Sequence, residues 1–424
     1  MQKLSQSLYQ AEFGANIFNL SNGLTIIHQY LPATPVVVTD VWVKAGAIAE
    51  PEEWSGMAHF LEHMIFKGSP KIMVGEFDRL IENTGGVANA ATSYDYAHFY
   101  LTTAAPDVAK TLPALADILL RATIADEEFI REREVVIEEI YASNDDPDFL
   151  GFQALCQNTY QHHPYRRSIL GNQDVLLKHT PNQMRCFHRT HYQPENMTVV
   201  IVGGIEQEVA LALINDNFSD FSVRSECPPV TIEAEPPAVT ISRQELHLPR
   251  IEQARLLMAW ICPGSQYLEE AIALDLIALL LAGGRSSGLV RELREERQLV
   301  IDLDCNLSLQ KDSSMFTISV WLETQNLEMV ESIIGDRLNQ LQHNLIPETE
   351  ISRAKRQLIN DYIFSTETPN QLASIYGFYN IVATASEAIL YPQIISKLQP
   401  EGLQAISRRY LSSERYAITV VKPA

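Results

Sequence analysis

The chain has 424 residues, 46% of them hydrophobic and 20% charged, which is the composition of an ordinary water-soluble globular protein. This length exceeds that of a typical single hydrophobic core, so two domains are expected. The 53 acidic residues outnumber the 32 basic ones and give a net charge of −21, which argues against nucleic acid or an anionic membrane as a partner and allows a preference for basic peptides.

The N-terminus and the cysteines indicate the cellular setting. The first residues contain no apolar core of the length that a signal peptide needs, and no later segment approaches about 18 uninterrupted apolar residues. A cytoplasmic protein with no membrane partner is therefore expected. The five cysteines are widely spaced and contain no Cys-x-x-Cys pair, which predicts reduced core thiols and neither a disulfide framework nor a second metal site: Cys156, Cys186, Cys227, Cys262 and Cys305.

Residues 55–68 predict a helix that carries half of a catalytic zinc site. His59, Glu62 and His63 form His-x-x-Glu-His, the inverted order of the zincin motif. On a helix the two imidazoles share one face and can reach one ion, with Glu62 beside them as a base. The alternative is a helix with two surface histidines. The apolar neighbours instead describe a largely buried helix, in which unpaired His and Glu side chains would be costly: Ala58, Phe60, Leu61, Met64, Ile65 and Phe66.

Residues 85–93 are small and extended, and a second strand is expected directly after them at 97–103. Gly85 and Gly86 allow another backbone to approach closely, which is typical of an edge strand. The alternative is an ordinary strand of a hairpin.

Residues 126–140 predict a partly buried helix that can supply a third metal ligand. Its apolar side chains have helical spacing, and Glu132 and Glu139, seven residues apart, lie on one stripe of the helix. Glutamates on other faces, such as Glu134 and Glu138, are expected to be solvated.

A proline-rich segment divides the chain almost in half. Residues 225–238 contain four prolines, which fit neither a helix interior nor a central strand. This predicts a zinc-bearing domain over residues 1–224, a linker over 225–238 and a homologous domain over 239–424. Each half contains a long strand followed by a helix and ends in a buried strand, at 97–103 and 196–204 in the first half and at 315–322 and 415–422 in the second.

The second half is predicted to keep the scaffold without the metal. Residues 350–363 align with the helix at 128–141, where Ala354 replaces Glu132 and Asp361 replaces Glu139, and no His-x-x-Glu-His occurs there. Strands mixed with helix pairs predict an α+β fold of two homologous sandwich domains, each a mostly antiparallel sheet covered on one face by helices.

His59, Glu62 and His63, followed by Glu139 in the sequence Arg-Glu-Val-Val-Ile-Glu-Glu-Ile, resemble the pitrilysin/insulinase family of zinc metallopeptidases. The chain is most similar to the half-length branch, which includes the mitochondrial processing peptidases and their bacterial relatives, and nearly its whole length is covered. The resemblance implies a processing-peptidase-like metallohydrolase fold. It also implies that His59, His63 and Glu139 bind Zn²⁺, that Glu62 activates the water, and that Glu132 supports the site from behind.

The resemblance further implies a binding mode for the substrate and a partner. In the family, the strand matching Asn89 and Ala90 pairs with the extended peptide substrate. An arginine and a tyrosine seven residues apart contact the substrate and the developing oxyanion. Arg294 fits the arginine, but Ile301 stands at the tyrosine position. A heterodimer in which a homologous subunit supplies the arginine-tyrosine pair is therefore expected; a homodimer is the alternative.

These observations predict a zinc metalloendopeptidase that hydrolyses unfolded peptides as the catalytic subunit of a dimer, with Glu62 as the general base. The competing interpretation is a non-catalytic core or scaffold subunit of a larger assembly. It is weakened because the ligands and the base of the motif are all present.

Overall fold

The protein is described by a computed structural model that covers residues 14–249 and 251–424. Its contacts group into two compact units. The first contains the described residues up to Tyr141, residues 167–231 and residues 365–389; the second contains residues 142–166, 232–364 and 390–424. No helix of the described residues is long and apolar enough to cross a membrane.

The first unit is built on a six-stranded sheet in the order β1-β2-β6-β3-β5-β4. Only β2 and β6 run parallel, so the sheet is mostly antiparallel, as predicted. Its central strand β6 is buried at every position, because its run of valines and isoleucines suits a strand covered on both faces. The strands are β1 (Asn16–Asn19), β2 (Thr25–Tyr30), β3 (Val36–Val43), β4 (Val87–Thr92), β5 (Ala97–Ala104) and β6 (Met197–Gly203).

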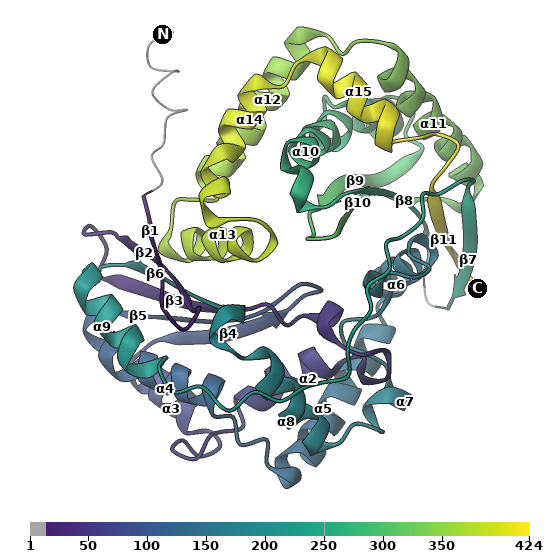
Figure 1. Cartoon of the computed structure of the whole chain (residues 1–424). Helices are drawn as coiled ribbons and strands as arrows, with labels where there is room; N and C mark the ends of the chain where they lie inside the picture. The colour runs from purple at the N-terminus through teal and green to yellow at the C-terminus, as the bar shows by residue number, and fades with distance from the viewer. Residues whose placement is uncertain (1–13, 250) are drawn as a thin grey trace. The chain divides into compact units, whose positions relative to one another are not determined.

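Helices with one apolar side cover one face of this sheet (Figure 1). Phe60, Leu112 and Phe129 lie in the resulting core with almost no exposed surface. The helices are α2 (Met57–Ile65), α3 (Glu76–Asn83), α4 (Val108–Leu120), α5 (Asp126–Asn144), α7 (Gln173–Leu176), α8 (Pro181–His191) and α9 (Gln207–Asn217).

The second unit repeats this plan with a five-stranded sheet in the order β7-β11-β8-β10-β9. β7 and β11 are parallel and the other pairs antiparallel, which matches β2-β6-β3-β5-β4 strand for strand. The predicted α+β fold with two homologous sheets is therefore confirmed. The strands are β7 (Ser242–Leu248), β8 (Ala254–Pro263), β9 (Val300–Ser308), β10 (Ser313–Leu322) and β11 (Ala417–Pro423), and the helices are α10 (Leu268–Ala282), α11 (Leu327–His343), α12 (Glu348–Phe364), α14 (Tyr391–Lys397) and α15 (Pro400–Tyr410).

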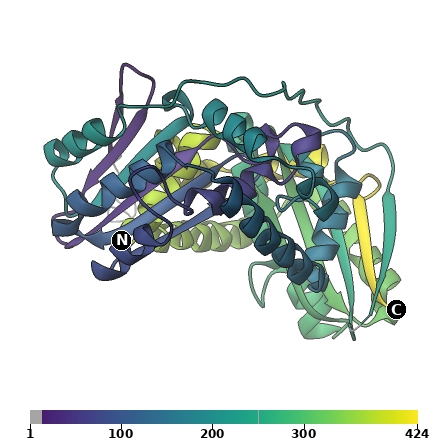
Figure 2. The same ribbon diagram turned by 90° about the horizontal axis from the view of Figure 1, so that it is seen from below.

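The expectation of helices on only one face of each sheet is corrected by an exchange of helices. α6 (Pro147–Thr159), from the first half of the sequence, packs on the second sheet, where Asn158 Nδ2 donates to the carbonyl oxygen of Ile418 (3.0 Å). α13 (Pro369–Val382), from the second half, packs on the first sheet, where Asn380 Nδ2 donates to Thr198 Oγ1 (2.8 Å). Figure 1 shows α13 on the side of the first sheet opposite α4, and Figure 2 shows the same yellow-green helix against the purple strands from a second direction.

The close approach of α13 to the first sheet depends on a glycine. A Cβ atom on Gly377 would lie 2.0 Å from Nε1 of Trp42 on β3. We therefore expect Gly377→Ala to lower the free energy of unfolding by about 2 kcal/mol, because the helix or the indole must shift. Urea unfolding measures this. Gly335→Ala is the matched control, because nothing lies within 4 Å of its Cβ position in α11, and it should instead stabilise by about 0.5–1 kcal/mol. Equal changes in both variants would contradict the packing argument.

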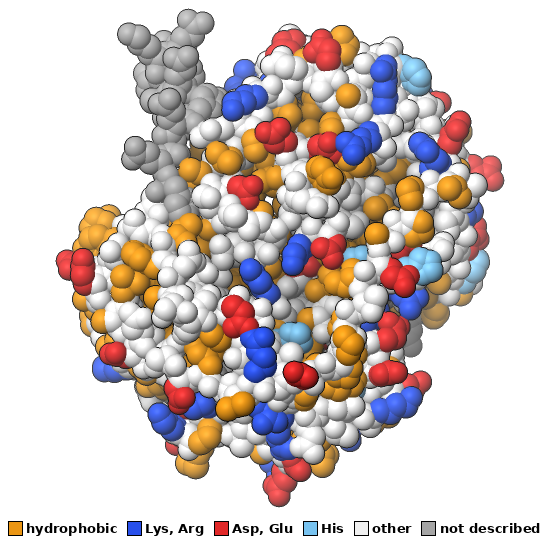
Figure 3. Space-filling model, in the orientation of Figure 1, with side chains coloured by type: hydrophobic (Ala, Val, Ile, Leu, Met, Phe, Trp, Pro, Cys, Tyr) orange, Lys and Arg blue, Asp and Glu red, His pale blue; other side chains and the backbone are white. Residues whose placement is uncertain are grey.

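Charged side chains of both signs are mixed over the face shown in Figure 3. Many are paired within one unit; for example, Arg121 Nε lies 2.6 Å from Asp117 Oδ1. Much of the charge is therefore locally balanced despite the acidic excess of the whole chain.

Candidate metal centre

α2 begins at a tight turn against neighbouring backbone. Its N-cap, Gly56, has φ +87°, and a Cβ there would lie 2.7 Å from the carbonyl oxygen of Leu170, so only glycine fits without strain. Phe60 and Leu61 on the helix are fully buried in the core. With its apolar side fixed in this way, α2 presents His59 and His63, four residues apart, toward α5.

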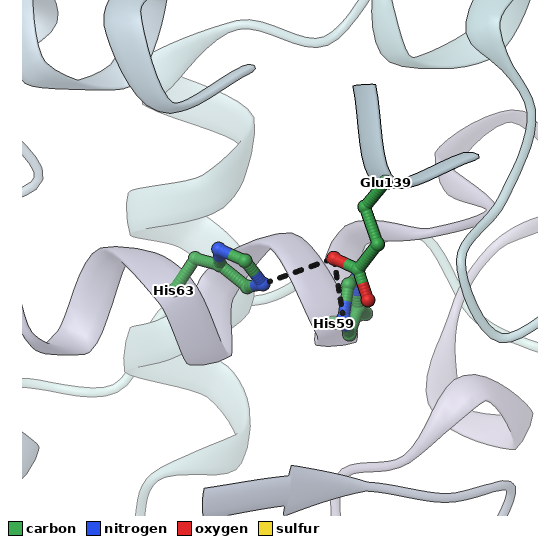
Figure 4. Close-up of side chains that lie close together, drawn as sticks. All are labelled: His59, His63 and Glu139. Carbon is green, nitrogen blue, oxygen red and sulfur yellow. Dashed lines mark ion pairs between the residues drawn. The ribbon is translucent and has the colours of Figure 1, made fainter. Parts of the chain in front are cut away.

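The side chains predicted to bind the metal come together. Glu139 Oε2 of α5 lies 3.6 Å from His59 Nε2 and 3.4 Å from His63 Nε2 (Figure 4). One ligand atom from each of the three lies within 4.8 Å of the others, and this is the one group of its kind within residues 14–249 and 251–424. In the second unit the counterpart helix α12 carries Ala354 and Asp361 instead.

Glu132 orients His63 from behind. His63 Nδ1 donates to Glu132 Oε1 (3.0 Å), which directs Nε2 toward Glu139, and Lys67 Nζ lies 2.6 Å from Glu132 Oε2. Burial lowers the pKa of His63, but the bonds to Glu132 and Glu139 outweigh it and raise that pKa to about 9. Burial raises the pKa of Glu132, but the hydrogen bonds from His63 and Lys67 outweigh burial, so the net effect is a lowered pKa. The supporting role that the resemblance implies for Glu132 stays a prediction, for which this contact supplies a geometry.

His59 is the more buried imidazole. Burial lowers its pKa to about 4, against the opposing effect of the Glu139 carboxylate. It is therefore neutral near pH 7, the form in which an imidazole nitrogen can bind a metal. Its Nδ1 is buried without a hydrogen-bond partner among the described residues.

Glu62 is tied to the neighbouring strand, a contact that the sequence analysis did not foresee. Thr92 Oγ1 at the end of β4 donates to Glu62 Oε2 (2.5 Å). Burial raises the pKa of Glu62, and the bond from Thr92 opposes this. A carboxylate with a raised pKa is a stronger base than an ordinary glutamate.

β4 is the last strand of its sheet and pairs only with β5 among the described strands, so the predicted edge strand is confirmed. Asn89 lies opposite Tyr100, and Ala90 opposite Phe99. Asn89 is exposed and Ala90 partly exposed. Their role in binding substrate stays a prediction.

Arg294 lies in the other contact unit, on a π-helical turn over Val290–Glu296. Its guanidinium contacts Glu295 Oε1 (3.1 Å) and Asp302 Oδ1 (2.9 Å). Ile301 is 48% exposed on β9, the counterpart of β4. The role of Arg294 therefore stays a prediction.

Glu50 is a site residue that sequence reasoning missed. It is fully buried, and its carboxylate accepts from the backbone N–H groups of Ala58 (2.7 Å, at Oε1) and Gly56 (3.0 Å, at Oε2) at the start of α2. The guanidinium of Arg167 donates to the carbonyl oxygen of Glu50 (3.1 Å). Burial raises the pKa of Glu50 to about 8, against the N–H donors and Arg167. In sequence Glu50 is indistinguishable from the exposed Glu53 nearby.

Because Glu50 provides the buried acceptor for two N–H groups of α2, we expect Glu50→Ala to lower the free energy of unfolding by about 2–4 kcal/mol. Chemical unfolding monitored by circular dichroism measures the change. The matched control is Glu53→Ala, which removes an exposed carboxylate three residues away and should change stability by at most about 0.5 kcal/mol. Similar losses in both variants would remove Glu50 from this role.

α8, which packs on α2, contains a buried neutral histidine. His188 Nε2 donates to the carbonyl oxygen of Leu119 (2.7 Å), and burial lowers its pKa to about 4. The unfolded chain takes up a proton at this residue near pH 6.5, whereas the folded chain does not, so its contribution to stability is lost as the pH falls from about 6.5 to about 4.

The free energy of unfolding should fall between pH 7 and pH 5 in both proteins. In His188→Gln this fall should be about 2 kcal/mol smaller than in the unmodified chain. Urea unfolding at the two pH values gives this difference. His162→Gln, at an exposed position, is the matched control for the substitution. An unchanged pH dependence in His188→Gln would show that His188 does not carry the effect.

Comparison with known proteins extends these observations. Two family descriptions match: "Insulinase (Peptidase family M16)" over residues 25–173 and "Peptidase M16 inactive domain" over residues 178–358. The chain is 26% identical over 408 residues to the zinc protease PqqE of Helicobacter pylori, with 95% of this chain and 92% of that protein aligned. It is 27% identical over 415 residues to the uncharacterized zinc protease YmxG of Bacillus subtilis, with 96% and 98% aligned.

The structure is also similar to a crystal structure of a protease from Helicobacter pylori, with a TM-score of 0.91, 25% identity and coverage of 96% of this chain and 99% of that one. The repeated sheet, the group of His59, His63 and Glu139, and these matches along nearly the whole length lead to one conclusion: the chain belongs to the M16 (insulinase) family of peptidases, in its half-length form, and is homologous to bacterial zinc proteases.

Proposed function

We propose that this protein is a zinc metalloendopeptidase that cleaves unfolded peptides. One observation carries the proposal: two imidazoles and a carboxylate offer ligand atoms within 4.8 Å of one another, with a partly buried glutamate one residue before the second histidine. The names of the relatives, zinc proteases of Helicobacter pylori and Bacillus subtilis, support the same activity.

The donor set fits zinc. His59, His63 and Glu139 would hold the ion, and two histidines with one carboxylate are a typical set of three protein ligands for a catalytic zinc with an open position. His63 is already oriented by Glu132. When bound, zinc lowers the pKa of a water molecule and polarises the carbonyl group of the substrate.

Glu62 performs the proton transfers. Thr92 holds its Oε2, so we assign the transfers to Oε1, which takes a proton from the attacking water and passes it to the leaving amine. The raised pKa that burial gives Glu62 makes its carboxylate a stronger base, which favours uptake of the proton from the attacking water.

The peptide is proposed to bind along β4. An edge strand can accept an extended peptide as an additional strand, which recognises main chain and leaves preference for sequence to side pockets. Asn89 and Ala90 lie on this strand, which ends at Thr92, the residue bonded to Glu62. A bound peptide would therefore lie beside the catalytic base. The net charge of −21 supports a preference for basic peptides.

We propose a dimer with a homologous subunit. Ile301 stands where the family carries a tyrosine, so a partner that supplies the arginine-tyrosine pair would complete the site. Loss of such a donor to the oxyanion costs roughly 10²-fold to 10³-fold in rate. A homodimer that works without the tyrosine is the alternative outcome.

The test is hydrolysis of a mixed library of unstructured peptides by the purified chain, with zinc content determined on the same sample and a chelator control. Zinc near one per chain with chelator-sensitive cleavage supports a self-sufficient peptidase. Zinc without cleavage points to a missing partner, which addition of a homologous subunit then tests. Absence of bound zinc after incubation with the ion would favour the scaffold function instead.

A further inference from the structure

Two thiols lie close together near the start of residues 225–238, the segment that connects the two halves of the sequence. Cys186 is on α8 and Cys227 is in the irregular segment after α9, and their Sγ atoms are 3.6 Å apart. All five cysteines are free thiols. Cys186 and Cys227 are partly exposed, whereas Cys156 and Cys262 are buried. Both pack against the core of the first unit without being fully buried, so the expectation of reduced core thiols holds for this pair only in part.

The segment around Cys227 is held on α8 by a few hydrogen bonds from one face of that helix. Thr190 Oγ1, one turn after Cys186, donates to the carbonyl oxygen of Ser225 (2.9 Å). The thiol of Cys227 donates to Thr190 Oγ1 (3.3 Å). The N–H group of Ser225 donates to the carbonyl oxygen of Arg189 at 3.4 Å, near the limit for such a bond. These contacts place the two sulfur atoms together without a covalent bond.

We propose that Cys186 and Cys227 form a redox-active dithiol. A low-molecular-weight disulfide oxidises this pair to a disulfide bond between Cys186 and Cys227. The new bond attaches the segment around Cys227 to α8. A disulfide requires sulfur atoms about 2.05 Å apart. A small shift closes the remaining gap, because Cys227 lies in neither helix nor strand. The inference does not depend on peptidase activity.

The reaction is a two-step exchange. The thiolate of Cys186 attacks one sulfur of the small disulfide, forms a mixed disulfide and releases one small thiol. Burial raises the pKa of Cys227 to about 12, so this thiol stays protonated and Cys186 is the attacking residue. Cys227 then gives up its proton, its thiolate attacks the sulfur of Cys186, and the second small thiolate leaves and takes up a proton. The protein dithiol is oxidised by two electrons and the small disulfide is reduced to two thiols.

The disulfide would reduce the number of residues in the connecting segment that are not anchored to either unit. At its other end Glu235 accepts from the backbone N–H groups of Gln161, His162 and His163 (2.8, 2.9 and 3.0 Å) within the second contact unit. With Cys227 bonded to α8, only residues 228–234 lie between the two anchored points. Oxidation would therefore restrict one of the segments that join the units.

The full-length chain is incubated with excess oxidised glutathione, blocked with a maleimide and mapped by mass spectrometry without reduction. We expect a crosslinked peptide containing Cys186 and Cys227, a fall from five titratable thiols to three after denaturation, and reversal by dithiothreitol. Cys227→Ser should instead accumulate a stable glutathione adduct on Cys186, because the second attack is lost. Cys305→Ser, the matched control, should still give the crosslink.

The rate of trypsin cleavage after Arg224 measures how firmly the segment around Cys227 is attached to α8, which we call the tether. The protease can cut there only when this segment leaves α8. We expect oxidation to slow this cleavage roughly tenfold in the unmodified chain and to leave the rate unchanged in Cys227→Ser. A lasting glutathione adduct on Cys186 of the unmodified chain, or no reaction of either thiol, would overturn the dithiol. A crosslink without slower cleavage would overturn the tether.

Discussion

Glu62→Gln should abolish most peptide hydrolysis while the protein keeps its zinc. The amide has nearly the same shape and can still accept the hydrogen bond from Thr92, but it cannot take up a proton from water. Loss of a general base lowers the turnover number by roughly 10²-fold to 10⁴-fold. Steady-state hydrolysis of a peptide identified from the library, with zinc content measured on the same preparation, tests this.

A second readout separates loss of the base from loss of structure. Burial raises the pKa of Glu62, which means that its charged form is costly in the folded protein. The Glu62→Gln protein, whose side chain is neutral at this position, should therefore be at least as stable as the unmodified chain in urea at pH 7. Glu82→Gln, which removes an exposed carboxylate on α3, is the control and should keep full activity. A Glu62→Gln protein that still turns over at the unmodified rate would exclude Glu62 as the base.

Glu139→Gln should lower zinc affinity at least about 100-fold, because a neutral amide replaces the carboxylate that lies between the two imidazoles. Competition with a chromogenic chelator measures the affinity directly, without any assay of activity. The matched control is Glu138→Gln, one residue away on α5 and exposed, which should bind zinc as the unmodified chain does.

Thermal unfolding gives an independent measure of the same change. Zinc at about 100 times its dissociation constant stabilises a folded protein by about 2.7 kcal/mol, so added zinc should raise the melting temperature of the unmodified chain and of Glu138→Gln. The Glu139→Gln protein should show little or no rise at the same zinc concentration. Equal zinc responses in the two variants would mean that Glu139 is not a ligand.

The parts of the site that could be predicted depend on local spacing. His59 and His63 share a helix face because they are four residues apart, and the apolar residues between them identify the buried side of α2. Glu139 was found through its spacing on a second helix together with the resemblance. In both cases a short periodic pattern determines the direction in which the side chain points.

Contacts made by chain segments that meet only in three dimensions could not be predicted. Glu50 reaches the N–H groups of α2 from a loop, and nothing in its neighbours distinguishes it from Glu53. The hydrogen bond from Thr92 to Glu62 depends on where the end of β4 lies relative to α2, which the sequence does not reveal. The 3.6 Å approach of Cys186 and Cys227 crosses an intervening strand and helix.

The exchange of helices was missed for a related reason. An apolar stripe on a helix shows that one side is buried, but it does not show which sheet covers that side. α6 and α13 occupy equivalent places in the two halves, and each packs on the sheet built by the other half.

This exchange also has a consequence for synthesis on the ribosome. Trp42, 2% exposed in the finished protein, is made early but is packed against α13, which ends at residue 382. During most of translation, one side of the first sheet therefore lacks its cover, and the nascent chain exposes apolar surface until the second half has emerged. Contacts between segments so distant in sequence also slow folding. Neither half of this protein is expected to reach its final packing before nearly the whole chain has been made.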